Sequence, residues 1–202
     1  MKKQSAWFIL SNASMEVENE NKPFFALLAG LLAISACQPT ASPTIPPKGS
    51  ILMLTLTSPS FKAGESIPAV HTCVGRGISP QLAWSGAPAD TQSFALIMDD
   101  PDAPGSTFVH WVFYNIPASS AGLAENAGAE AQPTDGSLQG KNSAGQAGYI
   151  GPCPPSGTHR YYFKLYALDT KLGQERMDKT ALLNAMQGHI LAQGELMGTF
   201  KK

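Results

Sequence analysis

The sequence has little charge and no concentration of charge of one sign. Of its 202 residues 14% are charged, and 14 Lys and Arg against 15 Asp and Glu give a formal net charge of −1. The basic residues are scattered, so no basic stripe exists to neutralise the phosphates of a nucleic acid. The composition therefore argues against nucleic-acid binding. The apolar fraction of 43% is enough for a sizeable core.

The sequence also lacks a hydrophobic run long enough to cross a bilayer. Its longest apolar run, residues 24–36, is too short to span a hydrocarbon core of about 30 Å as a helix, but it fits the core of a signal peptide. The run ends in Ser35 and Ala36 directly before Cys37. This ending resembles the lipobox of bacterial lipoproteins, which implies that the chain is cut before Cys37 and that the Cys37 thiol carries a diacylglycerol.

Three segments of the chain follow from this prediction. We expect a lipoprotein-type signal peptide at residues 1–36, a lipidated tether rich in Pro, Ser and Thr at residues 37–50, and a folded domain at residues 51–202. Translation from Met15 would shorten the long leader but remove its two lysines, so both Met1 and Met15 remain candidate starts. No Asp directly follows Cys37. In this respect the chain resembles bacterial lipoproteins that are sorted to the outer membrane. We therefore expect a bacterial envelope protein, anchored by lipid on the periplasmic face.

Cysteine is scarce, with three residues in the chain. If Cys37 is acylated, Cys73 and Cys153 remain as an even pair in an oxidising compartment. We hypothesise a disulfide between them, and the alternative of two buried free cysteines remains open. Zinc binding is disfavoured, because neither cysteine has a second ligand at finger-like spacing.

No helical period of useful length precedes residue 178, and the folded part has a strand-and-turn pattern. The 19 glycines and 16 prolines suit short strands joined by many turns. Residues 178–194 fit a helix that Asp178 caps, and residues 127–146 fit a surface loop. The sum predicts an all-β domain resembling a sandwich, with one or two peripheral helices. The expected strands are residues 51–57, 93–98, 108–116, 161–168 and 195–201.

Two histidines lie near the ends of expected strands. Strand alternation places His110 on the face of Phe108 and Val112, and it places Tyr114 there as well. By the same alternation His159 shares a face with Tyr161, Phe163 and Leu165. A single histidine in such a place is more often structural than ligand-binding. We treat the other two, His71 and His189, as structural.

The neighbours of these histidines carry a family resemblance. Residues 100–104 read Asp-Pro-Asp-Ala-Pro, His110-Trp111 follows, and residues 151–161 read Gly-Pro-Cys-Pro-Pro-Ser-Gly-Thr-His-Arg-Tyr. Together these stretches resemble the two signature regions of phosphatidylethanolamine-binding proteins, in particular the bacterial branch called Raf kinase inhibitor-like. The resemblance covers residues 51–202 in the expected order. The chain has Cys153 where eukaryotic members have a glycine, and it lacks their extended C-terminal helix over the pocket.

The resemblance implies two antiparallel sheets packed face to face and a pocket for phosphate, phosphorylated headgroups or other small anions. A carboxylate on one nitrogen of an imidazole would fix the tautomer and favour the charged ring, which offers its other nitrogen to an anion. Proline-rich walls would keep the pocket preformed. Carried over, the lining residues are Asp100, Asp102, His110, Pro154, Pro155, His159 and Tyr161.

The leading functional prediction is a non-catalytic module that binds a small anionic or phosphorylated ligand and regulates another protein, without a cofactor or metal. The alternative is an inhibitor of an envelope protease or other envelope enzyme, since the family includes inhibitors. A hydrolase that uses a His–Asp pair, with Ser156, is less favoured because the chain has no Gly-x-Ser-x-Gly elbow.

Overall fold

Strands dominate the described part of the chain, which comprises residues 51–129, 133–173 and 176–202 in this computed structural model. These residues belong to one unit, Ile45–Lys202. The predictions for the signal peptide (residues 1–36), for Cys37 and for the tether (residues 37–50) lie outside the described residues. Among the described residues, no helix is long and apolar enough to cross a membrane.

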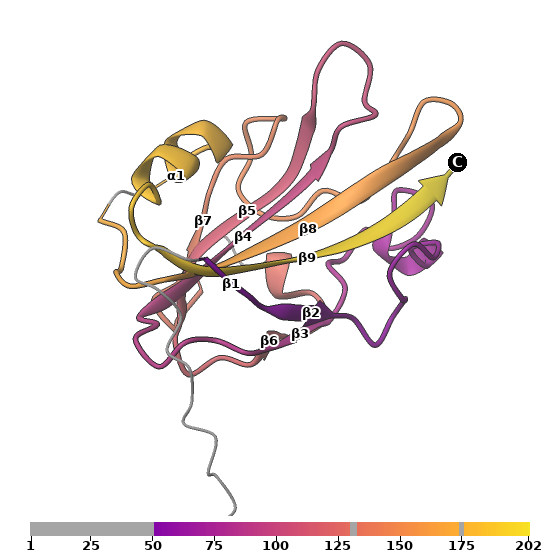
Figure 1. Cartoon of the computed structure of the whole chain (residues 1–202). Helices are drawn as coiled ribbons and strands as arrows, with labels where there is room; N and C mark the ends of the chain where they lie inside the picture. Colours follow the sequence, from indigo (N-terminus) through magenta and orange to yellow (C-terminus); the bar gives the residue numbers. More distant parts are fainter. Residues whose placement is uncertain (1–50, 130–132, 174–175) are drawn as a thin grey trace, which may run out of the picture. The chain divides into compact units, whose positions relative to one another are not determined.

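Two sheets pack face to face (Figure 1). Six strands form the larger sheet in the order β1-β9-β8-β4-β5-β7, and three form the smaller one in the order β2-β3-β6. All pairs are antiparallel except β1 with β9, which run parallel. The elements are β1 (Leu52–Met53), β2 (Thr55–Thr57), η1 (Ala69–His71), β3 (Leu82–Ser85), β4 (Ser93–Asp100), β5 (Phe108–Pro117), β6 (Gly122–Leu123), η2 (Ala127–Ala129), β7 (Leu138–Gln139), β8 (Thr158–Leu168), α1 (Lys179–Ala185) and β9 (Ile190–Lys201).

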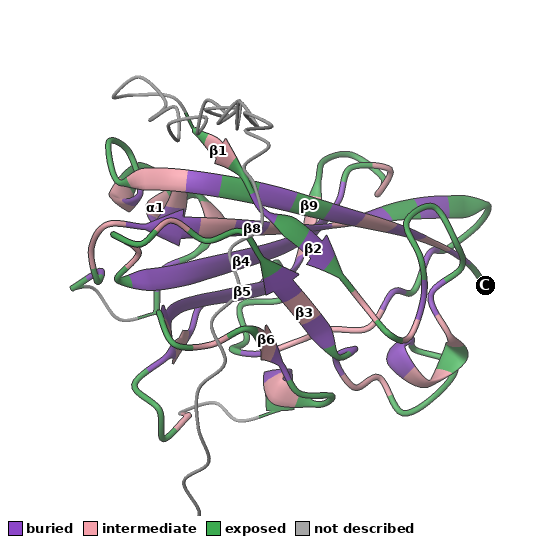
Figure 2. Cartoon of the chain, turned by 60° about the horizontal axis from the view of Figure 1, so that its bottom comes forward, coloured by how far each residue is buried: buried purple, intermediate pink, exposed green. Residues whose placement is uncertain are grey.

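The central strand β4 is buried along its whole length (Figure 2). Its inward face joins the main core between the two sheets, through Leu96 and Met98. Its outward face joins a second cluster, through Ala95 and Ile97, together with residues of α1 such as Leu182. Coverage on both faces explains why β4 reads as a continuous apolar run and not as an alternating one.

The helix α1 begins where the sequence predicts. The Asp178 carboxylate accepts a hydrogen bond from the backbone N–H of Ala181 at 2.8 Å, which is an N-cap. The helix ends at Ala185, well before Gly194, because residues from Ile190 onward pair with β8 as strand β9. The predicted helix of residues 178–194 is therefore wrong in its second half.

A β-bulge at His110 changes the face that the sequence assigned. Trp111 pairs with Met98 and Val109 pairs with Asp99, so His110 is an extra residue of β5 with no partner on β4. The bulge turns His110 to the inward side, while Val112 belongs to the outer cluster. The prediction that His110 shares a face with Val112 and Tyr114 is wrong, because strict alternation does not survive an inserted residue.

The expected surface loop at residues 127–146 is wrong in part. It contains η2 and the short strand β7, which pairs with β5. Ser137, Gln139 and Asn142 are buried, and the Gln139 side chain accepts a hydrogen bond of 2.7 Å from the Trp111 indole. Polar composition misled the prediction here, because these side chains are buried with hydrogen-bond partners.

A second bulge in β5 depends on Asn115. Its backbone φ is 56°, a left-handed conformation that few side chains tolerate. Its side-chain amide donates to Leu172 O at 2.7 Å and accepts from Leu172 N at 2.8 Å. These reciprocal bonds tie the end of β5 to the segment that follows β8.

We expect Asn115→Ala to lower the free energy of unfolding by about 3 kcal/mol, because it loses two buried hydrogen bonds and keeps the strained φ. Asn115→Gly loses the same bonds but relieves the strain, so its cost is about 1 kcal/mol smaller. Urea unfolding of the two variants beside the parent measures both costs. Equal costs would show that the backbone conformation carries no strain.

Candidate functional site

A cavity of about 170 Å³ opens at one end of the larger sheet. It lies where β4 ends and where β5 and β8 begin, so three strands each contribute a polar side chain: Asp100, His110 and His159. The remaining lining comes from turns and is mostly apolar. The lining residues are Asp100, Ala103, Pro104, Phe108, His110, Ile150, Gly151, Cys153, Pro154, Pro155 and His159.

Asp100 and His159 form a buried pair in this cavity. Their residues are 3% and 7% exposed, and His159 Nδ1 lies 2.7 Å from Asp100 Oδ2. An ionised carboxylate only accepts, so His159 Nδ1 carries the proton and Nε2 is directed away from the pair. The other oxygen, Asp100 Oδ1, accepts from the backbone N–H of Asp102 at 2.8 Å. Each oxygen of the Asp100 carboxylate therefore accepts a hydrogen bond, which fixes its orientation.

His110 is held in the same tautomer by a different group. Its Nδ1 lies 2.8 Å from Ile150 O, and because a carbonyl only accepts, Nδ1 is the donor. Burial lowers the pKa of His110, against the opposing effects of the Ile150 hydrogen bond and the Asp100 charge. The ring is thus neutral at pH 7, with the lone pair on Nε2.

Neither Nε2 atom has a hydrogen-bond partner among the described residues. The ring of His110 packs edge-on against Tyr161, with the centroids 5.2 Å apart, and the ring of His159 stacks on Tyr161 from 6.5 Å. Two imidazoles of fixed orientation therefore present free Nε2 atoms at the cavity.

Two residues predicted to line the pocket lie outside its lining. Asp102 is bound to the guanidinium of Arg160 through two hydrogen bonds of 2.9 and 2.6 Å. Hydrogen bonds from Arg160 lower the pKa of Asp102 to about 2. Tyr161 is fully buried with its ring against both histidines, and burial together with the nearby Asp100 carboxylate raises the pKa of its hydroxyl. The hydroxyl makes no hydrogen bond of ordinary geometry in the described part of the chain.

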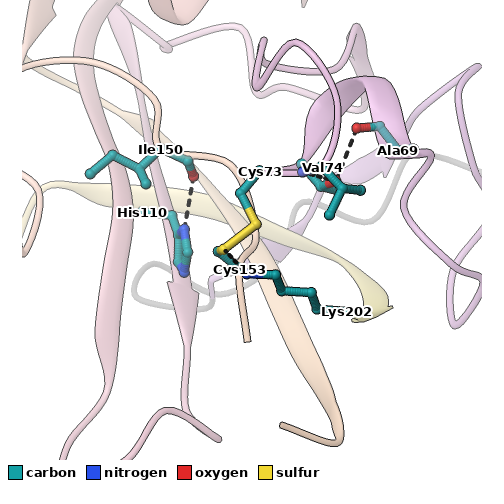
Figure 3. The surroundings of a disulfide bond; sticks show 8 residues. Ala69, Cys73, Val74, His110, Ile150, Cys153 and Lys202 are labelled. Atoms are coloured by element: carbon teal, nitrogen blue, oxygen red, sulfur yellow. Dashed lines mark hydrogen bonds between the residues drawn. A yellow bond between two sulfur atoms is a disulfide. The ribbon is translucent and has the colours of Figure 1, made fainter. Parts of the chain in front are cut away.

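The proline loop forms one wall of the cavity and is joined to a distant segment. Cys153 is bonded to Cys73 across 80 residues, with the Cα atoms 5.4 Å apart (Figure 3). Both cysteines are exposed, so the alternative of two buried free thiols is wrong. Sequence reasoning placed Pro154 and Pro155 in the pocket and missed Cys153. Its position next to the proline pair was the available signal.

Phe108 is a further lining residue that sequence reasoning missed. Its ring packs against His110 with the centroids 4.8 Å apart. Alternation had already put Phe108 on the face of His110, which was enough to nominate it.

The other candidates of the sequence lie elsewhere. His71 is buried, with Nδ1 3.0 Å from Ile78 O, and the exposed His189 pairs with Asp169 at 2.8 Å. Ser156 is exposed and is not part of the cavity lining. Within residues 51–129, 133–173 and 176–202, no group of three or more His, Cys, Asp or Glu side chains is placed to hold a metal ion.

A larger and more open hollow of about 510 Å³ lies beside the start of α1. Its lining contains no histidine, and Lys179, one of its two lining lysines, is paired with the buried Asp99. The smaller cavity is therefore the candidate site, because three buried titratable side chains, Asp100, His110 and His159, converge on it.

Comparison with known proteins gives the family of the chain. A sequence model described as phosphatidylethanolamine-binding protein matches residues 57–201. The chain belongs to the phosphatidylethanolamine-binding protein family. A UPF0098 protein of Methanothermobacter thermautotrophicus is 48% identical over 150 residues, which cover 74% of this chain and 99% of the relative. A UPF0098 protein of Chlamydia muridarum is 46% identical over 153 residues, which cover 73% and 98%.

Two solved structures share the fold. The phosphatidylethanolamine-binding protein homologue CT736 of Chlamydia trachomatis is 43% identical, with a TM-score of 0.69 over 74% of this chain and 98% of that one. YbcL of Escherichia coli, described as a new member of the mammalian PEBP family, is 36% identical, with a TM-score of 0.68 over the same shares. The names of the family and of these relatives state no catalysed reaction.

The neutral buried ring of His110 predicts a loss of stability in acid. Its folded pKa lies below the ordinary value of 6.5. The unfolded chain therefore binds the proton first, and the free energy of unfolding falls as pH drops from 6.5 through the folded pKa. His110→Gln cannot titrate, so we expect it to lose less stability between about pH 7.5 and about pH 5 in urea unfolding. An equal loss in both proteins would contradict the assignment of a buried neutral ring.

Proposed function

We propose that the chain is a non-catalytic binding protein whose cavity takes a small anion, such as phosphate or a phosphorylated headgroup. The observation that carries the proposal is the convergence of two free imidazole Nε2 atoms on one small, rigidly walled cavity. Each protonated Nε2–H donates a charge-assisted hydrogen bond to an anionic oxygen. The family name adds phosphatidylethanolamine to the ligands to test.

The size of the cavity favours a headgroup over a whole lipid. A volume of about 170 Å³ holds about six water molecules at roughly 30 Å³ each. Drug-sized ligands occupy pockets of about 300–1,000 Å³, so this cavity suits a single phosphate-sized group.

The charges of the cavity favour an anion that arrives with a proton. The Asp100 carboxylate is placed to compensate a positive charge on His159, and burial favours the neutral ring of His110. An anion near His110 favours the imidazolium form, so binding draws a proton onto this ring. The bound complex then contains two donors for one anion.

The lining does not favour catalysis. Its one sulfur nucleophile, Cys153, is consumed in a disulfide, and the lining contains no serine. A hydrolase would need a water attacking under the control of the His159–Asp100 pair. Release of nitrophenol from p-nitrophenyl acetate or p-nitrophenyl phosphate, lost in His159→Ala, would favour that alternative.

A titration of the full chain with inorganic phosphate and with phosphoethanolamine tests the proposal. We expect saturable NMR shifts of the His110 and His159 ring signals, with affinity at least about tenfold weaker in His159→Ala. His189→Ala is the matched control, because His189 also pairs with an aspartate but lies outside the cavity. The absence of any shift at millimolar ligand would overturn the proposal. Ethanolamine alone should produce no saturable shift.

The proton uptake predicts tighter anion binding in acid. Sulfate keeps its charge over the working range, so its affinity reports the protein alone. We expect the dissociation constant of sulfate to fall as pH drops from about 7.5 to about 5.5, because protonation of His110 adds a positive donor. His110→Gln should remove most of this dependence. A pH-independent constant for the parent would contradict the role of His110.

A further inference from the structure

The disulfide occupies an unusual place, since one of its cysteines is part of the cavity lining. Cys153 lies between Gly151 and the proline pair in the cavity wall, here defined as residues 149–155. Cys73 lies in the segment of residues 69–77, which begins with η1. The bond closes a loop of 80 residues, so it joins two parts of the chain that no local structure would hold together.

The cavity wall touches the 69–77 segment at three further points. The Tyr149 hydroxyl donates to His71 O at 2.7 Å, and Cys73 N donates to Pro152 O at 3.1 Å. A Cβ placed on Gly151 would lie 3.0 Å from His71 O, so the two backbones are in direct contact. The disulfide is the covalent part of this junction.

The opposite side of the wall holds His110. Ile150 accepts from His110 Nδ1 at 2.8 Å, and its N–H donates to His110 O at 3.0 Å (Figure 3). Movement of the wall away from the 69–77 segment therefore acts directly on the tautomer, the burial and the position of this ring. Three consecutive residues connect the 69–77 segment to the cavity: Gly151 and Pro152 contact this segment, and Ile150 bonds to His110.

The two residues of the disulfide lie at the surface. Both cysteines are exposed, and the neighbouring Val74 is 54% exposed. The Lys202 ammonium lies 3.9 Å from Cys153 Sγ. A cation beside a sulfur stabilises the thiolate, which makes Cys153 the better leaving group in an exchange.

We infer that the Cys73–Cys153 disulfide is a thiol-exchange site and that its reduction loosens the cavity wall and weakens anion binding. The effect on binding rests on the function proposed above. The reductant is a dithiol. Its thiolate attacks Cys73 Sγ, a mixed disulfide forms, and Cys153 leaves as the thiolate. The second thiol of the reductant then displaces Cys73, so the reductant is oxidised to a disulfide by two electrons and the protein gains two thiols.

The test compares oxidised and dithiothreitol-reduced forms of the full chain carrying Cys37→Ser, so that only the pair at the cavity responds. We expect the free-thiol count to rise from none to two and the dissociation constant of phosphate to rise about tenfold. We also expect the pKa of His110, followed by NMR, to move up towards 6.5 as water reaches the loosened site. The double variant Cys73→Ser/Cys153→Ser is the matched control and should bind like the reduced form with or without dithiothreitol.

Two outcomes separate this inference from the proposed function. Equal phosphate affinity in the two redox states, with two thiols counted after reduction, would overturn this inference. The proposed anion-binding function would then still stand. If neither state binds phosphate, the proposed function fails, and the pKa of His110 then decides the coupling alone. An unchanged pKa overturns the coupling, and a rise supports it.

The rate of reduction tests whether the disulfide is reduced in the native state or only after the protein unfolds. We expect a rate that does not change with low concentrations of urea, because the sulfurs are reached in the native state. A rate that rises in step with global unfolding would overturn the exchange site. Lys202→Ala should slow native-state reduction about twofold. An unchanged rate would contradict the role of this ammonium.

Discussion

Two buried carboxylates at the end of β4 must be paired, and much of the site depends on how each is paired. A buried charge without a partner costs several kcal/mol, so neither Asp99 nor Asp100 can be left alone. They are consecutive residues of a strand and therefore point to opposite faces. Asp99, 1% exposed, is bound outward by Lys164 and Lys179. Asp100 is bound inward by His159. The outward pair with Lys179 fastens the start of α1 to the sheet, and the inward pair orients one imidazole at the cavity.

Most strands of the larger sheet could be predicted from runs of apolar, β-branched and aromatic residues between turns, and the failures lie where tertiary packing overrides the local pattern. The strands around Leu96, Phe113 and Phe163 are apolar and β-branched or aromatic over several residues, so their existence was clear. The bulge at His110 could not be seen, because it is set by the register of β5 against β4. The second half of the predicted helix fails for a similar reason, since Ile190 pairs with Leu168 and the pairing outweighs local helix propensity.

The residues of the candidate site were nominated by motif, and their arrangement required the fold. The aspartates of the first signature are two residues apart, and nothing local tells them apart. Strand β4 ends at Asp100, so Asp102 lies in the turn beyond it. There Asp102 accepts a hydrogen bond from Arg160 of the adjacent strand β8. Tyr161 alternates with Arg160 and enters the core, where its ring packs against both imidazoles. Cys73 could be matched to Cys153 only as the remaining pair, since 80 residues separate them.

The cavity wall influences both the orientation and the protonation of His110. Burial favours the neutral form of His110, and Ile150 of the surrounding wall also fixes its tautomer. The cavity therefore holds the Nε2 lone pair of His110 and the ring of His159, whose Nδ1 is hydrogen-bonded to Asp100. In the proposed complex, an anion would change this balance by bringing a proton with it. A looser wall would hydrate His110 and raise its pKa, but it would also release the ring from the geometry that directs Nε2 at the anion of the proposed complex. A charged but unoriented His110 ring would bind an anion weakly, because hydrogen bonds to an anion are strong only when their donors are held in place.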